Sequence, residues 1–115
     1  MLEGFQAYGE EHGIEVLYAE GCKITLNENC HWLVNEEPIM STREIDAPLM
    51  AEAVVTLNKS DAGILVIGEN ELINREAWSE KHEGDVDHLN LVGQQLDLAK
   101  ALLKTGKPLI VILIN

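Results

Sequence analysis

The fold is decided by two uninterrupted apolar runs, Ala62-Gly63-Ile64-Leu65-Val66-Ile67 and Leu109-Ile110-Val111-Ile112-Leu113-Ile114. A strand with one face in water alternates apolar and polar residues, whereas a strand covered on both faces is apolar throughout. Both runs are therefore predicted to be buried strands of a parallel sheet.

The segment before these strands is predicted to form a helix, a short strand and a long loop. Apolar residues recur at helical spacing over residues 2–11, and Gly13 follows as a residue suited to a left-handed cap. Residues 14–18 are β-branched and apolar, which is typical of a strand. Residues 22–45 show no sustained period and are predicted to be a long loop.

Two further helices are predicted around the apolar runs. The second helix is expected to start from an N-cap at Asp46, with Pro48 in its first turn, and to end near Lys59. The third is expected over residues 92–103, where leucines and alanines recur at helical spacing before Gly106. The predicted order is helix, strand, helix, strand, helix, strand.

Alternating helices and apolar strands predict an α/β fold, a three-layer αβα sandwich with a mostly parallel, flavodoxin-like, doubly wound sheet. A chain that begins on a helix and stops after a central-looking strand is expected to be a piece of a longer protein. Residues 1–115 are thus expected to form a single partial domain with long loops at 22–45 and 69–91.

The charge balance restricts the partners. The chain has 115 residues, of which 46% are hydrophobic, and its 20 acidic against 8 basic residues give a net charge of −12. Such a charge repels phosphate backbones and anionic lipid, so nucleic acid and membrane insertion are not expected. A free sheet edge would allow pairing into a homo-oligomer.

The cysteines indicate no metal or redox motif. Cys22 and Cys30 do not form a CxxC pair, which argues against a zinc ribbon and a thioredoxin-like site. Free thiols are the favoured interpretation, and a disulfide between the two is the alternative.

The loop after the first apolar run carries the richest chemistry. Residues 69–91 contain seven carboxylates, two histidines and one tryptophan. Loops that follow parallel strands are where open α/β sheets bind ligands. Composition alone favours a solvated charged loop. The group His82, Glu83, Asp85, Asp87 and His88 matches no known metal-ligand spacing, so no metal and no cofactor are expected.

Several pieces of the chain, taken in order, resemble one family. They are Gly68-Glu69, Arg75-Glu76-Ala77-Trp78, Gly84-Asp85, Leu89-Asn90-Leu91-Val92-Gly93-Gln94-Gln95, Thr105-Gly106-Lys107-Pro108 and the final apolar strand, together with Tyr18-Ala19-Glu20-Gly21-Cys22. This order is similar to the C-terminal domain of family 3 glycoside hydrolases. The likeness covers nearly the whole chain and is weakest over residues 23–45.

The resemblance implies an (α/β)₆ sandwich that packs against an N-terminal (β/α)₈ barrel, absent here, which carries an aspartate nucleophile. It implies a retaining β-glycosidase that releases terminal β-linked glucose or xylose from oligosaccharides or glycosides, and a periplasmic or secreted location. Because the nucleophile lies elsewhere, residues 1–115 alone are expected to be inactive.

In many members of this family the acid/base glutamate comes from the loop that matches residues 69–91, so the resemblance implies an acid/base in this loop. Glu76 is the first choice, because Arg75-Glu76-Ala77 resembles the basic residue, glutamate and small residue found there. Glu80 is the alternative, since in shorter loops the acid/base lies a few residues before the Gly-Asp pair.

The other loop residues have a functional and a structural interpretation. Trp78 would stack on a sugar or anchor the loop, and Arg75 would bind substrate or form an exposed ion pair of about 0 to 1 kcal/mol. Glu69 and Asp85 are expected to support the loop through bonds to nearby backbone amides.

A different function class is a non-catalytic, doubly wound ligand-binding or interaction module, which the same alternation of helices and strands would allow. The sequence argues against it, because no glycine-rich phosphate loop follows a strand and no acidic cluster ends an N-terminal strand.

Overall fold

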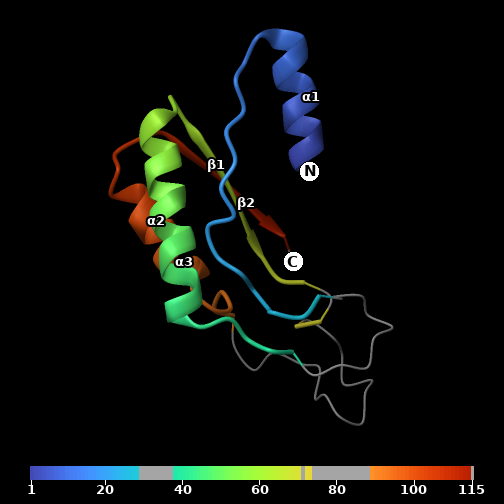
Figure 1. The fold of residues 1–115 in the computed structure, drawn as a ribbon, viewed down its shortest axis with the longest axis vertical. Helices are drawn as coiled ribbons and strands as arrows, with labels where there is room; N and C mark the ends of the chain where they lie inside the picture. The colour runs from blue at the N-terminus through green and yellow to red at the C-terminus, as the bar shows by residue number, and fades with distance from the viewer. Residues whose placement is uncertain (29–37, 71, 74–88, 115) are drawn as a thin grey trace.

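The computed structural model describes residues 1–28, 38–70, 72–73 and 89–114. The elements in chain order are α1 (Leu2–His12), α2 (Arg43–Lys59), β1 (Gly63–Gly68), α3 (Gln95–Leu103) and β2 (Leu109–Ile114) (Figure 1). The chain is therefore a small α/β domain.

The two strands form a parallel sheet. Their register runs from Gly63 opposite Leu109 to Gly68 opposite Ile114, so the whole of each strand is paired. Parallel strands need a crossover connection, and α3 lies within the segment that joins them. Both predicted strands and their parallel pairing are confirmed.

The hydrophobic core lies between this sheet and two helices. Its buried side chains come from α2, β1 and α3, and they are Ala53, Leu57, Leu65, Ile67, Leu98 and Leu102. Figure 1 shows α2 and α3 together on one side of the strands. Burying each such leucine or isoleucine contributes about 1.5 to 3 kcal/mol, so this layer supplies most of the apolar stabilisation of the described domain.

The opposite face of the sheet is apolar and open among the described residues. Ile64 on β1 is 48% exposed and its partner Ile110 on β2 is 60% exposed. The burial expected for both faces of each strand is found only in β1, where Leu65 and Ile67 are buried on the α2 and α3 side. Their partners on β2, Val111 and Leu113, are exposed. α1 leaves both Ile64 and Ile110 exposed, so it does not bury this face.

Residues 14–18 do not form the predicted strand. Ile14, Leu17 and Tyr18 are exposed, and strand pairing in the described part of the chain is confined to β1 and β2 and one isolated bridge elsewhere. The segment is instead tied to α1, because the backbone N–H of Ile14 donates to Gly9 O at 2.8 Å. The segment therefore leaves α1 through a capping turn and pairs with no strand of the described residues.

Two helix starts differ from the prediction, whereas all three helix ends agree with it. Gly13 caps α1 with φ 69°, as expected. Thr42, not Asp46, is the N-cap of α2, so Asp46 lies inside the first turn and is fully buried. α3 starts at Gln95 rather than at residue 92, because Gly93 has a φ of 65° that a helix interior does not accommodate.

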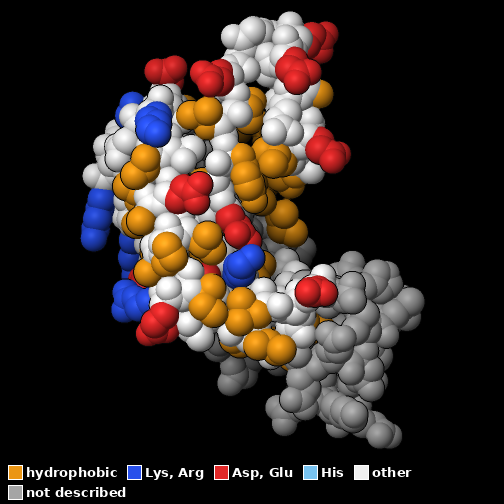
Figure 2. All heavy atoms as spheres, in the orientation of Figure 1, with side chains coloured by type: hydrophobic (Ala, Val, Ile, Leu, Met, Phe, Trp, Pro, Cys, Tyr) orange, Lys and Arg blue, Asp and Glu red, His pale blue; other side chains and the backbone are white. Residues whose placement is uncertain are grey.

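Charge is distributed unevenly over the surface. In Figure 2 the visible Lys and Arg side chains gather mainly on the side where Figure 1 places α2 and α3, and acidic side chains spread over the rest of that face. Among the described residues, none of the helices has the length and apolar character needed to cross a membrane.

Candidate functional site

The candidate site is the edge of the sheet at which both parallel strands end, called here the carboxyl edge, with Gly68 and Ile114 as its last strand residues. Ligands of open parallel sheets bind at this edge. Glu69 leaves it half-buried, and its backbone N–H donates to Ile114 O at 3.0 Å. The chain is therefore still held to β2 where the loop 69–91 begins.

Gly68 is required by this close approach. Its φ of 145° lies in a region that L side chains rarely adopt. A Cβ built there would overlap the carbonyl oxygen of Ile114 and would stand 2.8 Å from Ile114 N. A residue with a side chain cannot occupy this position unless β2 moves away from β1.

Gln95, the first residue of α3, is bonded to the same place. Its side chain is 1% exposed. Oε1 accepts the Gly68 N–H at 2.7 Å, and Nε2 donates to Gly68 O at 2.8 Å and to Val92 O at 2.9 Å. One amide thus joins the end of β1 to the segment that leads into α3.

A turn follows Glu69 and fixes the next residues of the loop. The Asn70 Oδ1 accepts the backbone N–H groups of Leu72 and Ile73, each at 3.1 Å. Its Nδ2 donates to Thr25 Oγ1 at 3.3 Å, and Leu72 is fully buried. The first residues of the loop are therefore anchored by a buried leucine and an asparagine-capped turn.

A buried carboxylate supports the neighbouring segment. Asp46 Oδ1 accepts the Ser41 hydroxyl at 2.9 Å and the Lys23 N–H at 3.0 Å, whereas Oδ2 has no partner among the described residues. The Cys22 thiol beside it has its pKa raised to about 11 by burial, and further by the negative charges of Asp46 and Glu20. Cys22 is a free thiol in the described part of the chain, and its raised pKa keeps it protonated at neutral pH, which leaves it a poor nucleophile.

Most of the predicted site residues lie outside the described residues, namely Arg75, Glu76, Trp78, Glu80 and Asp85, and so does Cys30. The structure places Glu69 at the carboxyl edge. No group of three or more His, Cys, Asp or Glu side chains suited to a metal ion occurs in the part of the chain that the structure describes.

Sequence reasoning missed the supports of the edge, Gln95 and Asn70. A signal for Gln95 exists in helical spacing, because it precedes Leu98 and Leu102 on the buried side of α3. Buried polar side chains are hydrogen-bonded, so a glutamine on the buried side of a helix is predicted to bond other buried polar groups.

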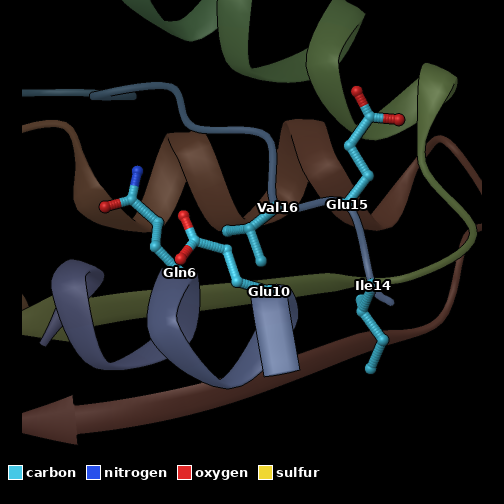
Figure 3. A pocket seen from close by; sticks show the side chains of 5 residues that line it. All are labelled: Gln6, Glu10, Ile14, Glu15 and Val16. Carbon is cyan, nitrogen blue, oxygen red and sulfur yellow. The ribbon is translucent and has the colours of Figure 1, made fainter. Parts of the chain in front are cut away.

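A separate shallow hollow lies between α1 and the segment after it (Figure 3), lined by Gln6, Glu10, Ile14, Glu15 and Val16. Glu10 and Val16 lie toward one another there, and the side chains of Ile14 and Glu15 point away from them. In Figure 1 the turn after α1 lies at the same end of the molecule as the start of β1, away from the carboxyl edge. The hollow is therefore not part of the candidate site.

These features define the class of the protein: an α/β domain with a parallel sheet, whose loop at the carboxyl edge is anchored by buried polar side chains. The family is more specific. Residues 1–115 match the glycosyl hydrolase family 3 C-terminal domain over the whole chain, and the chain belongs to this family.

The chain is similar to several glycosidases. The chain is 31% identical to a periplasmic β-glucosidase of Salmonella typhimurium and 31% identical to a β-xylosidase of Formosa agariphila, over all of its own length in each case. A solved structure of a β-glucosidase from Erythrobacter marinus matches 99% of the chain, with a TM-score of 0.83 and 35% identity. The chain spans 14%, 12% and 16% of the lengths of these three proteins.

Proposed function

We propose that this chain is the acid/base and aglycone-side part of a retaining β-glycosidase that releases terminal β-linked glucose or xylose. One observation carries the proposal: a carboxylate-rich loop starts at the carboxyl edge, and hydrogen bonds from Gln95 and Asn70 anchor it there. The family membership and the names of the relatives support the chemistry.

The proposed reaction is a double displacement. Two carboxyl groups about 5 Å apart act as nucleophile and acid/base in retaining glycosidases. In this proposal the nucleophile comes from a barrel domain of the same enzyme. The acid/base carboxyl first protonates the departing glycosidic oxygen and then removes a proton from water, which attacks the glycosyl-enzyme intermediate.

Glu76 is the proposed acid/base, and Glu80 is the second candidate. A carboxyl group that faces another carboxylate has a raised pKa, which keeps it protonated for the first step. Trp78 and Arg75 are proposed to bind the aglycone side of the substrate. Glu69 is proposed to support the loop through bonds from its carboxylate to nearby backbone amides. Asp85 is proposed to do the same.

The wider architecture belongs to the same proposal. The open apolar face of the sheet supports a second helical layer supplied by other parts of the enzyme, which would complete the three-layer sandwich. Residues 1–115 are then one partial domain, and the barrel is its partner within the enzyme. A periplasmic or secreted location is proposed from the Salmonella relative.

The test is kinetic and uses the complete enzyme that contains this chain, with Glu76→Gln and Glu80→Gln as the two variants to be compared. Aryl β-glycosides with good and poor leaving groups are compared with and without azide. Loss of acid catalysis slows poor leaving groups by about 10²- to 10⁴-fold and good ones far less. Azide is expected to restore turnover as a β-glycosyl azide.

The result selects the residue. If Glu80→Gln shows the leaving-group dependence and Glu76→Gln does not, Glu80 is the acid/base. If neither variant shows it, the loop does not supply the acid/base, and if the unmodified enzyme hydrolyses no aryl β-glycoside the proposed function is wrong.

A further inference from the structure

Gln95 lies outside the loop that carries the proposed chemistry, yet it touches both ends of that loop. Gly68 precedes residue 69 and Val92 follows residue 91, and the side-chain amide of Gln95 bonds to the backbone of both. All three bonds are between 2.7 and 2.9 Å, which is ideal length for an amide and a carbonyl.

We propose that Gln95 is a positioning residue for catalysis, which holds the two ends of the loop 69–91 in a fixed relation to each other and to the sheet. The inference rests on the proposed function, because it assigns to Gln95 the task of orienting the loop that carries the acid/base. Gln95 is not proposed to be a catalytic residue, because its side-chain amide is hydrogen-bonded to backbone groups and not to substrate.

Burial makes these bonds strong determinants of geometry. Gln95 is 1% exposed, so water does not replace a lost partner, and a buried backbone group without a partner is strongly disfavoured. The amide also supplies both a donor and an acceptor to Gly68. A hydroxyl or a carboxylate on the same side chain could not make all three bonds.

Gly68 lies where the loop begins, so the orientation of its backbone sets the direction in which the loop leaves the sheet. Gly68 adopts a φ that only glycine readily accepts, at the point where the chain leaves β1 and turns into the loop. If the Glu69 N–H to Ile114 O bond were the only contact here, the conformational freedom of Gly68 would let the loop leave the sheet in several directions. The bonds from Gln95 to both its N–H and its carbonyl remove this freedom.

The experiment compares three variants of the complete enzyme. Gln95→Met keeps the length and volume of the side chain and removes the amide. Gln95→Glu keeps the length, and its protonated form can accept from Gly68 and donate to only one carbonyl. Gln94→Met is the matched control, since this neighbouring glutamine makes none of the three bonds.

Two readouts are needed. The first is kcat/KM for aryl β-glycosides with poor and good leaving groups. Misplacement of a reacting group by about 1 Å can cost about 10²-fold, so Gln95→Met is expected to slow poor leaving groups by about 10- to 100-fold and good ones much less. Gln95→Glu is expected to fall between Gln95→Met and the unmodified enzyme, more nearly normal at low pH.

The second readout does not depend on activity. Hydrogen exchange is measured on peptides that cover residues 66–73 and 89–96. Exchange is expected to accelerate by about tenfold or more in Gln95→Met and to stay normal in Gln94→Met. This shows whether the bonds hold the ends of the loop in solution.

The outcomes separate the two proposals. Faster exchange together with a leaving-group-dependent loss supports the positioning role. If exchange accelerates while both substrates lose rate equally or lose none, Gln95 is only structural and the inference is overturned, although Glu76→Gln can still establish the proposed function. Unchanged exchange in Gln95→Met also overturns it. Failure of the proposed function is recognised separately, because the unmodified enzyme then hydrolyses neither substrate.

Discussion

Replacement of Gly68 by alanine is expected to be among the most damaging single-methyl additions in this domain. The φ of 145° carries a strain of about 1 to 3 kcal/mol for a residue with a Cβ. The new methyl group would also overlap the carbonyl of Ile114, which is backbone and can yield only if β2 moves. Overpacking of this kind typically costs about 1 to 3 kcal/mol.

Movement of β2 would also break the bond from the Glu69 N–H to Ile114 O, worth about 1 kcal/mol. The expected loss in the free energy of unfolding for Gly68→Ala is therefore about 3 to 7 kcal/mol. Domains are stable by about 5 to 15 kcal/mol in total, so the variant should be close to unfolded.

Substitutions at two other glycines distinguish the cost of a positive φ from the cost of steric overlap. Gly106 has a φ of 73° with nothing within 4 Å of a built Cβ, so Gly106→Ala should cost only about 1 kcal/mol. Gly4 lies inside α1 with equally open surroundings, so Gly4→Ala should stabilise by about 0.5 to 1 kcal/mol. Urea unfolding followed by circular dichroism gives all three values. A Gly68→Ala loss within about 0.5 kcal/mol of the Gly106→Ala loss would refute the steric argument.

Two further predictions concern the buried groups near the carboxyl edge. Cys22, measured in a Cys30→Ser background, should react with a disulfide reagent at pH 8 about tenfold more slowly in the folded chain than in urea. The rise of its pKa from 9.0 to about 11 lowers the thiolate fraction about 100-fold, and the greater nucleophilicity of the more basic thiolate restores about tenfold. Because the pKa of Cys22 is raised on folding, the stability that it contributes is present below pH 9 and is lost as the pH rises from 9 toward 11. The urea midpoint should therefore fall over this pH range, and Cys22→Ser should remove that fall. An unchanged fall in Cys22→Ser would show that Cys22 does not cause it. Asp46→Asn keeps an acceptor for Ser41 and Lys23 and should unfold within about 1 kcal/mol of the unmodified chain, whereas Asp46→Ala should lose about 2 to 4 kcal/mol. Equal losses for the two variants would show that the charge, rather than the acceptor, is required.

Much of the fold could be predicted because its signals are local. The apolar runs of β1 and β2 and the glycine that caps α1 are properties of consecutive residues, and their predicted structures are confirmed. The predicted strand at residues 14–18 is wrong. The composition of this segment fits a strand, but a strand forms only where a partner strand pairs with it, and composition does not show the partner. The turn after α1 fixes the segment at Gly9 instead.

The helix starts could not be predicted fully because several residues compete for the same role. Thr42 and Asp46 are both good N-caps, and the sequence does not show which one lies buried against Lys23 and Ser41. At α3 the leucine spacing continues through residue 92, but the left-handed Gly93 prevents a helix there.

The candidate site, like the fold, could be predicted only in part. The location of the loop at the carboxyl edge follows from the order of strand and loop, and Glu69 lies there. The contacts of Gln95 with Gly68 join residues that are 27 apart in sequence, so no local pattern shows them. The roles of Glu76 and Glu80 stay predictions.

The amide bridge between Gly68 and Val92 has a consequence for how such enzymes can be altered. Because the two ends of the segment are held together at its base, the residues beyond the anchors Asn70 and Leu72 can change in number or kind without moving the sheet. Each doubling of loop length costs only about 0.6 kcal/mol in closure entropy. The segment can therefore act as an exchangeable cassette, in which grafted sequences would test new aglycone preferences on an unchanged scaffold.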